Sequence, residues 1–232
     1  MYQPNLRCSW TITVSRGRRA TIRFTSLDVE EQPGCVYDYL QVRDGADSIS
    51  DSLGKFCGST IPSPVVASGR TMFLVFVSDG SVGGAGFSVE YAGVTNLARR
   101  RSTAQSSTGY GLTSSKAVDG ITDGIVWHYS CTHTHTQSNP WWRVDLGSTR
   151  TIFAVDVFNR VDECCSDRLN PFYVHVGHST SVTSNPTCGG QQSVSGDYKS
   201  VPCNGLQGRY VGVALQGSGR TLTLCEVKVF GV

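Results

Sequence analysis

Nine cysteines in 232 residues, two of them adjacent at positions 164 and 165, constrain the fold of this chain more than any other feature. No CxxC pair of the kind that builds structural zinc sites accompanies them, so disulfides formed in an oxidising compartment are their simplest use. We therefore expect a secreted or extracellular protein. The odd count leaves one cysteine without a partner, and residues 1–4 carry neither the charge nor the apolar run of a signal segment. Both observations suggest a fragment whose natural N-terminus is missing.

Short runs of alternating apolar and polar residues, separated by Gly, Pro and Ser, occur along most of the chain. Examples are Ser9–Val14, Ala20–Phe24 and Tyr39–Val42. No window of helical length carries an apolar stripe, so the pattern predicts an all-β protein. Residues 87–91 have the pattern of a closing strand, which predicts two domains, 1–93 and 94–232.

The balance of charge excludes some partners. Lys and Arg number 8 against 9 Asp and Glu in residues 1–93, and 12 against 9 in residues 94–232. Binding to nucleic acid usually needs a larger excess of positive charge, so we expect no nucleic-acid partner. The longest apolar run, residues 72–77, is far shorter than the roughly 20 residues that cross a bilayer, and we expect no membrane insertion.

Ordered motifs in the first domain resemble those of the CUB domain family: Tyr2–Trp10, Cys35–Asp38, Phe56–Gly58 and Phe76–Ser81. The resemblance implies a β-sandwich with a disulfide between Cys35 and Cys57. The family's first cysteine would lie upstream of Tyr2, which leaves Cys8 as the unpaired one.

Carboxylates from three separate segments of this domain, Glu30, Asp38 and Asp79, would repel one another in a compact sandwich unless a cation neutralised them. A hard, oxygen-preferring ion such as calcium suits them. The resemblance to calcium-binding CUB domains adds Ser81 and Tyr2 to this set, with Glu31 as an alternative to Glu30. It also implies that a protein partner inserts a Lys or Arg beside the ion. The competing interpretation is that these are solvated loop residues.

Motifs throughout residues 94–232 resemble the F-type lectins, or fucolectins, which are jelly rolls of the discoidin kind. They are Ala117–Gly120, Ser130–Thr134, Asn139–Leu146, Asn159–Asp162, Cys203–Gly205, Gly208–Val211 and Leu224–Val227. The resemblance implies disulfides Cys131–Cys225, Cys188–Cys203 and Cys164–Cys165. The function it implies is binding of fucosylated glycans.

In the family's sugar motif, 26 residues separate a His from Arg-x-Asp, and four residues separate that Asp from a second Arg or Lys. His133, Arg160 and Asp162 fit, but Arg168 follows one residue too late. Planar guanidinium groups suit adjacent ring hydroxyls, because each presents several N–H donors in a fixed fork. Asp162 would hold Arg160 in place.

Apolar groups are expected to face the carbons of the sugar. The rigid disulfide of Cys164 and Cys165 would pack on the ring, and Trp127 would contact the methyl group of fucose, with Tyr110 and Leu112 as alternatives. The resemblance further implies a structural calcium ion held by Asp123, Ser130 and Glu226 and by backbone oxygens around Ile121, Ile125 and Cys225.

Two other functions compete with a lectin. His128, Cys131, His133 and His135 cluster like the ligands of a catalytic metal, but no HExxH or nucleophile motif occurs, so we expect no enzyme. The other alternative is an extracellular adaptor that binds proteins through its CUB domain, with a lectin-like domain whose sugar specificity has been lost or altered. The extra residue before Arg168 is the reason to consider it.

Overall fold

Strands form almost all of the regular structure, so the all-β prediction is confirmed. The structure, a computed structural model, describes all residues 1–232 and divides into two units, Met1–Thr95 and Asn96–Val232. The division falls two residues beyond the boundary expected from the sequence, because strand β7 (Gly86–Asn96) continues past Tyr91. None of the helices is long and apolar enough to cross a bilayer.

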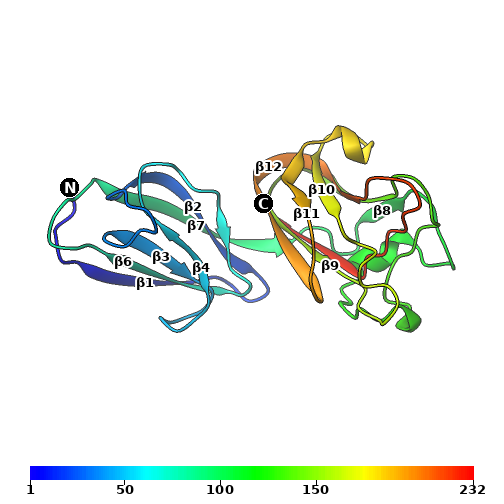
Figure 1. Ribbon diagram of the computed structural model, residues 1–232, viewed down its shortest axis with the longest axis horizontal. Helices are drawn as coiled ribbons and strands as arrows, with labels where there is room; N and C mark the ends of the chain where they lie inside the picture. The colour runs from blue at the N-terminus through cyan, green and yellow to red at the C-terminus, as the bar shows by residue number, and fades with distance from the viewer. The chain divides into compact units, whose positions relative to one another are not determined.

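The N-terminal unit has two antiparallel sheets (Figure 1). The strand order of the first sheet is β1 (Arg7–Thr13), β6 (Thr71–Val77), β3 (Tyr39–Arg43) and β4 (Ser52–Phe56). In the second sheet β2 (Arg19–Asp28) pairs with β7 on one side and β5 (Val65–Val66) on the other.

Alternation along these strands builds the core of the unit. Successive side chains of a strand point to opposite faces, so every second residue of β2, β3 and β6 reaches the space between the sheets. The residues buried there include Ile22, Phe24, Leu40, Val42, Met72, Leu74 and Phe76. The loops that leave the ends of these strands carry the acidic residues singled out by the sequence.

The C-terminal unit is a discoidin-like jelly roll (Figure 1). Its main sheet has the order β11 (Thr187–Gln192), β10 (Phe172–Gly177), β12 (Tyr198–Ala214), β9 (Trp141–Phe158) and β13 (Glu226–Gly231), and β8 (Ser102–Gln105) pairs with β9. Three short 3-10 helices lie in its connections: η1 (Ser114–Val118), η2 (Val126–His128) and η3 (Val182–Ser184).

A clamp between two loops positions the functional end of this unit. Residues 132–134 run beside residues 222–224, where the N–H groups of Thr132 and Thr134 donate to the carbonyls of Leu224 and Leu222 at 2.7 and 3.0 Å. The return bonds run from the N–H groups of Leu224 and Leu222 to the hydroxyls of Thr132 and Thr134, at 3.0 and 2.9 Å. These buried threonine hydroxyls therefore replace the carbonyls of an ordinary ladder and fix the residue between them, His133.

Candidate functional site

Loops at one end of the C-terminal unit enclose a pocket of about 480 Å³. Its walls are formed by Tyr110, Leu112, Val126, Trp127, Tyr129, His133, Thr136, Arg160, Cys164, Cys165, Arg168 and Thr221. All the residues expected to contact a sugar lie in this wall except Asp162, which stands behind Arg160. Segments up to 111 residues apart in the chain thus contribute to one concave surface.

The imidazole of His133 is oriented by hydrogen bonds on both ring nitrogens. Nδ1 lies 2.6 Å from the carbonyl oxygen of Thr134, so Nδ1 carries the proton and Nε2 presents a lone pair. Nη1 of Arg168 donates to Nε2 at 3.1 Å. Burial, together with the nearby charges of Arg168 and Arg160, holds the pKa of His133 below its usual value. The ring is therefore neutral at pH 7 and offers an acceptor to the pocket.

Arg160 is held by a two-pronged ion pair with Asp162. Its Nη2 donates to Oδ2 of Asp162 at 2.8 Å, and its Nε donates to Oδ1. The arginine is only 4% exposed, and its hydrogen bonds lower the pKa of Asp162. Nη2 also approaches Sγ of Cys164 at 3.2 Å, while Nη1 has no protein partner. Two N–H donors on a rigid fork therefore remain for a ligand.

The adjacent cysteines Cys164 and Cys165 form a disulfide in the wall of the pocket. The extra residue, Glu163, is exposed, and the turn that contains it is closed by a bond from the N–H of Cys165 to the carbonyl of Asp162 at 3.2 Å. Arg168 still reaches His133. The additional residue is thus accommodated upstream of the disulfide, where a charged side chain is readily solvated.

Aromatic side chains form the opposite wall. The sequence presented Trp127, Tyr110 and Leu112 as alternatives, whereas the structure places all three around the pocket. Trp127 is 76% exposed and Tyr110 is 86% exposed, and the Tyr110 ring stands edge-on to His133 with centroids 5.0 Å apart. Exposed aromatic rings gathered around one pocket are typical of a surface that contacts a ligand.

Four further lining residues were not singled out by sequence reasoning: Val126, Tyr129, Thr136 and Thr221. Tyr129 ends η2 in the left-handed conformation at φ 58°, and it is 68% exposed. A second aromatic residue two positions after Trp127 was a usable signal. The hydroxyls of Thr136 and Thr221 lie 2.9 Å apart although 85 residues separate them, and no local pattern marks such a pair.

In the N-terminal unit, the acidic residues expected to bind calcium lie together. One carboxylate oxygen from each of Glu30, Asp38 and Asp79 lies within 4.8 Å of the others. Asp38 accepts bonds from the Tyr2 hydroxyl at 2.5 Å and from the N–H of Asp79 at 2.7 Å. The hydroxyl of Ser81 donates to Asp79 at 3.1 Å. All five predicted residues therefore belong to one cluster.

The charge of this acidic cluster is incompletely compensated. Oε2 of Glu30 is buried without a hydrogen-bond partner, and burial followed by the charges of Asp79 and Asp38 raises the pKa of Glu30. The alternative residue, Glu31, lies beside Gly58 instead. An unpartnered carboxylate oxygen among two other carboxylates and two hydroxyls fits the oxygen ligands that calcium prefers.

The second expected calcium site fits in part. Glu226 is fully buried, its Oε1 has no hydrogen-bond partner, and burial raises the pKa of this carboxyl to about 8. Its Oε2 accepts from the N–H of Gly120 at 3.2 Å. The hydroxyl of Ser130 donates to the carbonyl of Ile125 at 2.9 Å, so two expected ligands are neighbours. A divalent cation would ionise Glu226 and satisfy its free oxygen.

Asp123 departs from the expected arrangement at this site. Its Oδ2 lies 2.6 Å from Nδ1 of His128, and its Oδ1 accepts from the N–H of Ile125 at 2.9 Å. The hydrogen bond from His128 is the main reason that the pKa of Asp123 is lowered. The short loop from 123 to 130 brings His128 within reach of this carboxylate, a contact that sequence reasoning did not foresee.

The structure contains four disulfides, Cys35–Cys57, Cys131–Cys225, Cys164–Cys165 and Cys188–Cys203, and Cys8 is free and partly exposed. These are the pairs that the two resemblances imply. Because Cys131 is in a disulfide with Cys225, its sulfur is not a thiolate ligand. The cluster considered for a catalytic metal therefore lacks one of its four members.

Comparison with known proteins assigns both units. A family model described as CUB domain matches residues 1–91, and one described as NedA-like, galactose-binding domain matches residues 116–213. One similar solved structure is the lectin domain of lectinolysin in complex with Lewis B antigen, which is 36% identical in sequence to the matching part of this chain. The match covers 58% of this chain and 95% of that domain, with a TM-score of 0.53. The chain is a CUB domain followed by an F-type lectin domain.

Two further relatives agree with this assignment. A fucose-binding module of Streptococcus pneumoniae is 32% identical in sequence to the lectin domain. The match covers 60% of this chain and 96% of that module, with a TM-score of 0.53. Bone morphogenetic protein 1 of Xenopus laevis is 42% identical over 90 residues of the CUB domain, which is 39% of this chain and 13% of that protein. The chain spans 8 to 40% of the length of the first curated relatives it matches.

Neither family is enzymatic, since CUB and F-type lectin domains are binding modules. The lectin domain has a carbohydrate-binding fold. Its pocket combines charged donors on one side with apolar groups on the other, which is the character of a site for a small, partly apolar polyol.

Proposed function

We propose that this protein is an extracellular, calcium-dependent lectin that binds terminal L-fucose, with a CUB domain that binds a protein partner. The observation that carries the proposal is the convergence of His133, Arg160 and Arg168 on one pocket whose other walls are a disulfide and exposed aromatic rings. Fucose has the matching character, because its hydroxyls and its methyl group give it one polar and one apolar side.

The hydrogen-bond roles of the three residues are complementary to one hydroxyl group. His133 offers a lone pair at Nε2, while Arg160 and Arg168 have only donors. A hydroxyl placed between them donates its proton to His133 and accepts N–H groups from the arginines. This hydroxyl thereby replaces the one hydrogen bond between Arg168 and His133. An epimer that directs this hydroxyl elsewhere leaves buried donors unpaired, at a cost of about 1 to 3 kcal/mol each.

The apolar side of the pocket suits the remaining surface of the sugar. Cys164 and Cys165 offer a small rigid sulfur surface to the ring carbons, and Trp127 offers a flat face to the methyl group. Galactose carries a polar hydroxymethyl group where fucose carries a methyl group. Burying that group against Trp127 without a partner is unfavourable.

Calcium would act on structure rather than on the sugar directly. In the lectin domain, Glu226, Ser130 and the backbone around Ile125 and Cys225 would hold an ion that ties β13 to the loop bearing Trp127. In the CUB domain, Glu30, Asp38, Asp79, Ser81 and Tyr2 would hold another. A Lys or Arg of a protein partner would then pair with the carboxylates around that ion.

Four disulfides support an extracellular location, because such bonds persist in oxidising compartments. The alternative function, a protein-binding adaptor that does not bind sugar, is less well supported. The reason to consider it was that the extra residue could displace Arg168 from the pocket. Nη1 of Arg168 lies 3.1 Å from His133 despite the added Glu163.

A glycan array probed with the full chain tests the proposal. We expect binding to fucosylated glycans, abolished by free L-fucose and unaffected by free D-galactose. Binding to no fucosylated glycan, or binding that free fucose leaves intact, would contradict the lectin function and favour the adaptor.

A further inference from the structure

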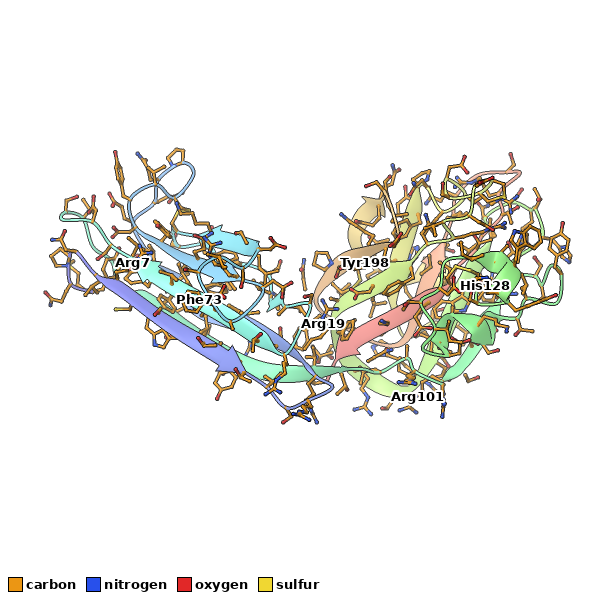
Figure 2. The ribbon with its side chains drawn as sticks, turned by 90° about the horizontal axis from the view of Figure 1, so that it is seen from below. Arg7, Arg19, Phe73, Arg101, His128 and Tyr198 are labelled. Carbon is orange, nitrogen blue, oxygen red and sulfur yellow. A yellow bond between two sulfur atoms is a disulfide. The ribbon has the colours of Figure 1, made fainter.

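A second concave region of the lectin domain is lined by unpaired cations. Arg100, Arg101 and Lys116 surround a hollow of about 360 Å³, whose wall also includes Ser115, Val118 and Asp119. None of its residues belongs to the sugar pocket. Figure 2 shows Arg101 at the surface of the unit, well apart in that view from His128.

The backbone beneath these side chains is well anchored. The N–H of Arg100 donates to the carbonyl of Val118 at 2.8 Å, and the N–H of Arg101 donates to the carbonyl of Ala98 at 3.0 Å. Ala98 and Val118 are both buried in the core of the domain. The cations therefore project from a fixed base, and a ligand would not have to order the chain there.

Most of the net charge of the lectin domain lies around this hollow. Residues 94–232 have 12 Lys and Arg against 9 Asp and Glu. The hollow is lined by three of these cations, Arg100, Arg101 and Lys116, and by one of these anions, Asp119. The hollow thus has a net charge of +2, out of +3 for the whole domain.

Two other arginines of the domain are paired with carboxylates, whereas these are not. Arg160 pairs with Asp162, and Arg209 donates to Asp145 through Nε and Nη2 at 2.7 and 2.8 Å. The side chains of Arg100, Arg101 and Lys116 form no hydrogen bond or ion pair. Asp119 makes a hydrogen bond with the N–H of Ile121 at 2.8 Å instead of an ion pair with them.

We infer that Arg100, Arg101 and Lys116 form a second binding site, which takes the sulfate groups of an acidic polysaccharide. A guanidinium fork matches two oxygens of a sulfate, and several cations around one hollow hold such a group better than scattered surface charges do. A cluster confined to one hollow suits a sulfated glycan better than duplex nucleic acid, whose evenly spaced phosphates need a long positive track. The disulfides indicate an oxidising compartment, where sulfated glycans are found.

Heparin binding to the intact chain in 150 mM NaCl tests this inference by surface plasmon resonance. Two double variants are compared: Arg100→Gln/Arg101→Gln in the hollow, and Arg150→Gln/Lys199→Gln, which makes the same change of charge elsewhere on the domain. Equal melting temperatures and intact disulfides by mass spectrometry verify that both variants are folded. Further arms use N- and O-desulfated heparin and a 20-base-pair DNA duplex.

We expect the hollow variant to bind heparin about tenfold more weakly, with a salt dependence reduced by about two units, and the control variant to change by less than twofold. Desulfated heparin and DNA should bind weakly, and free fucose should not compete with heparin. Absence of heparin binding by the unmodified chain, or an equal loss in both variants, would overturn the inference. Stronger binding to DNA than to heparin would also overturn it and indicate a nucleic-acid site.

Discussion

Nη1 of Arg168 donates to Nε2 of His133 at 3.1 Å, across 35 residues of sequence and one residue more than the family spacing allows. This contact links the two loops that form the polar side of the sugar pocket. It also places the positive charge of Arg168 against the neutral imidazole of His133. Sugar binding should therefore depend on the charge state of His133.

Replacing Arg160 with Ala should reduce the affinity for L-fucose by about 10- to 100-fold, because the change removes two donors and leaves the partly buried Asp162 without its partner. Isothermal titration calorimetry with fucose measures the effect. Arg209→Ala is a matched control, since Arg209 makes a similar two-pronged pair with Asp145 outside the pocket. An equal loss in both variants would show that the effect on binding is indirect.

Acid should release the sugar. The pKa of His133 lies below 6.5, mainly because of burial, so the ring stays neutral and accepts a proton from a hydroxyl at pH 7. Protonation makes Nε2 a donor and places a third positive charge beside Arg160 and Arg168. The affinity for fucose should therefore be constant above pH 6.5 and fall below the lowered pKa of His133.

Folding stability should depend on pH through the same residue. Between the lowered pKa of His133 and 6.5, the unfolded chain takes up a proton that the folded chain does not. This contribution to stability is thus fully present above pH 6.5 and is lost as the pH falls.

Fucose titrations from pH 8 to pH 4.5 with a His133→Gln variant as control measure the effect of acid on binding. An identical pH profile in that variant would assign the transition to another group.

Removing the adjacent disulfide should impair binding more than stability. A bond between neighbouring residues closes almost no loop, so Cys164→Ser/Cys165→Ser should change the melting temperature only slightly. Cys131–Cys225 spans 94 residues, and its loss should cost about 2 to 5 kcal/mol. Fucose affinity should fall in the first variant because its rigid apolar surface is gone. Unfolding of that variant, or unchanged affinity, would contradict this role.

Calcium uptake by the CUB domain should depend on Asp79. Asp79→Asn removes the charge of one of the three clustered carboxylates. Charged oxygen ligands of this kind are the ones that a hard divalent ion needs most. Calorimetry should find two calcium ions bound to the unmodified chain and one bound to the variant, with fucose binding retained. Glu31→Gln is the control, because Glu31 lies beside Gly58 rather than in the cluster. Two ions bound to the Asp79 variant would place the site elsewhere.

The fold and most of the site were predictable because each signal is local or has a fixed spacing. Alternation predicted strands such as β3, since a half-buried strand must repeat every two residues. The resemblance to F-type lectins, whose motif the spacing from His133 to Arg160 matches, implied that both residues line one pocket. The orientation of His128 toward Asp123, and the pairing of Thr136 with Thr221, depend on how separate loops pack, which no spacing encodes. The hollow at Arg101 was missed because its charges are neighbours of Lys116 only after folding.

Glu226 permits a test of the second calcium ion that separates binding from folding. Burial raises the pKa of this carboxyl to about 8, so the calcium-free protein at pH 7 holds it mainly in the neutral form, which an amide imitates. Glu226→Gln should therefore leave the melting temperature in EDTA nearly unchanged. It should also abolish the part of the calcium-dependent rise that belongs to the lectin domain, because an amide oxygen carries no charge for the ion. Differential scanning fluorimetry in EDTA and in 5 mM CaCl₂ measures both. Ser130→Ala removes a neutral ligand and should weaken calcium binding less than Glu226→Gln does. If the Gln variant gains as much stability from calcium as the unmodified chain, Glu226 is a buried acid of the core and not a ligand.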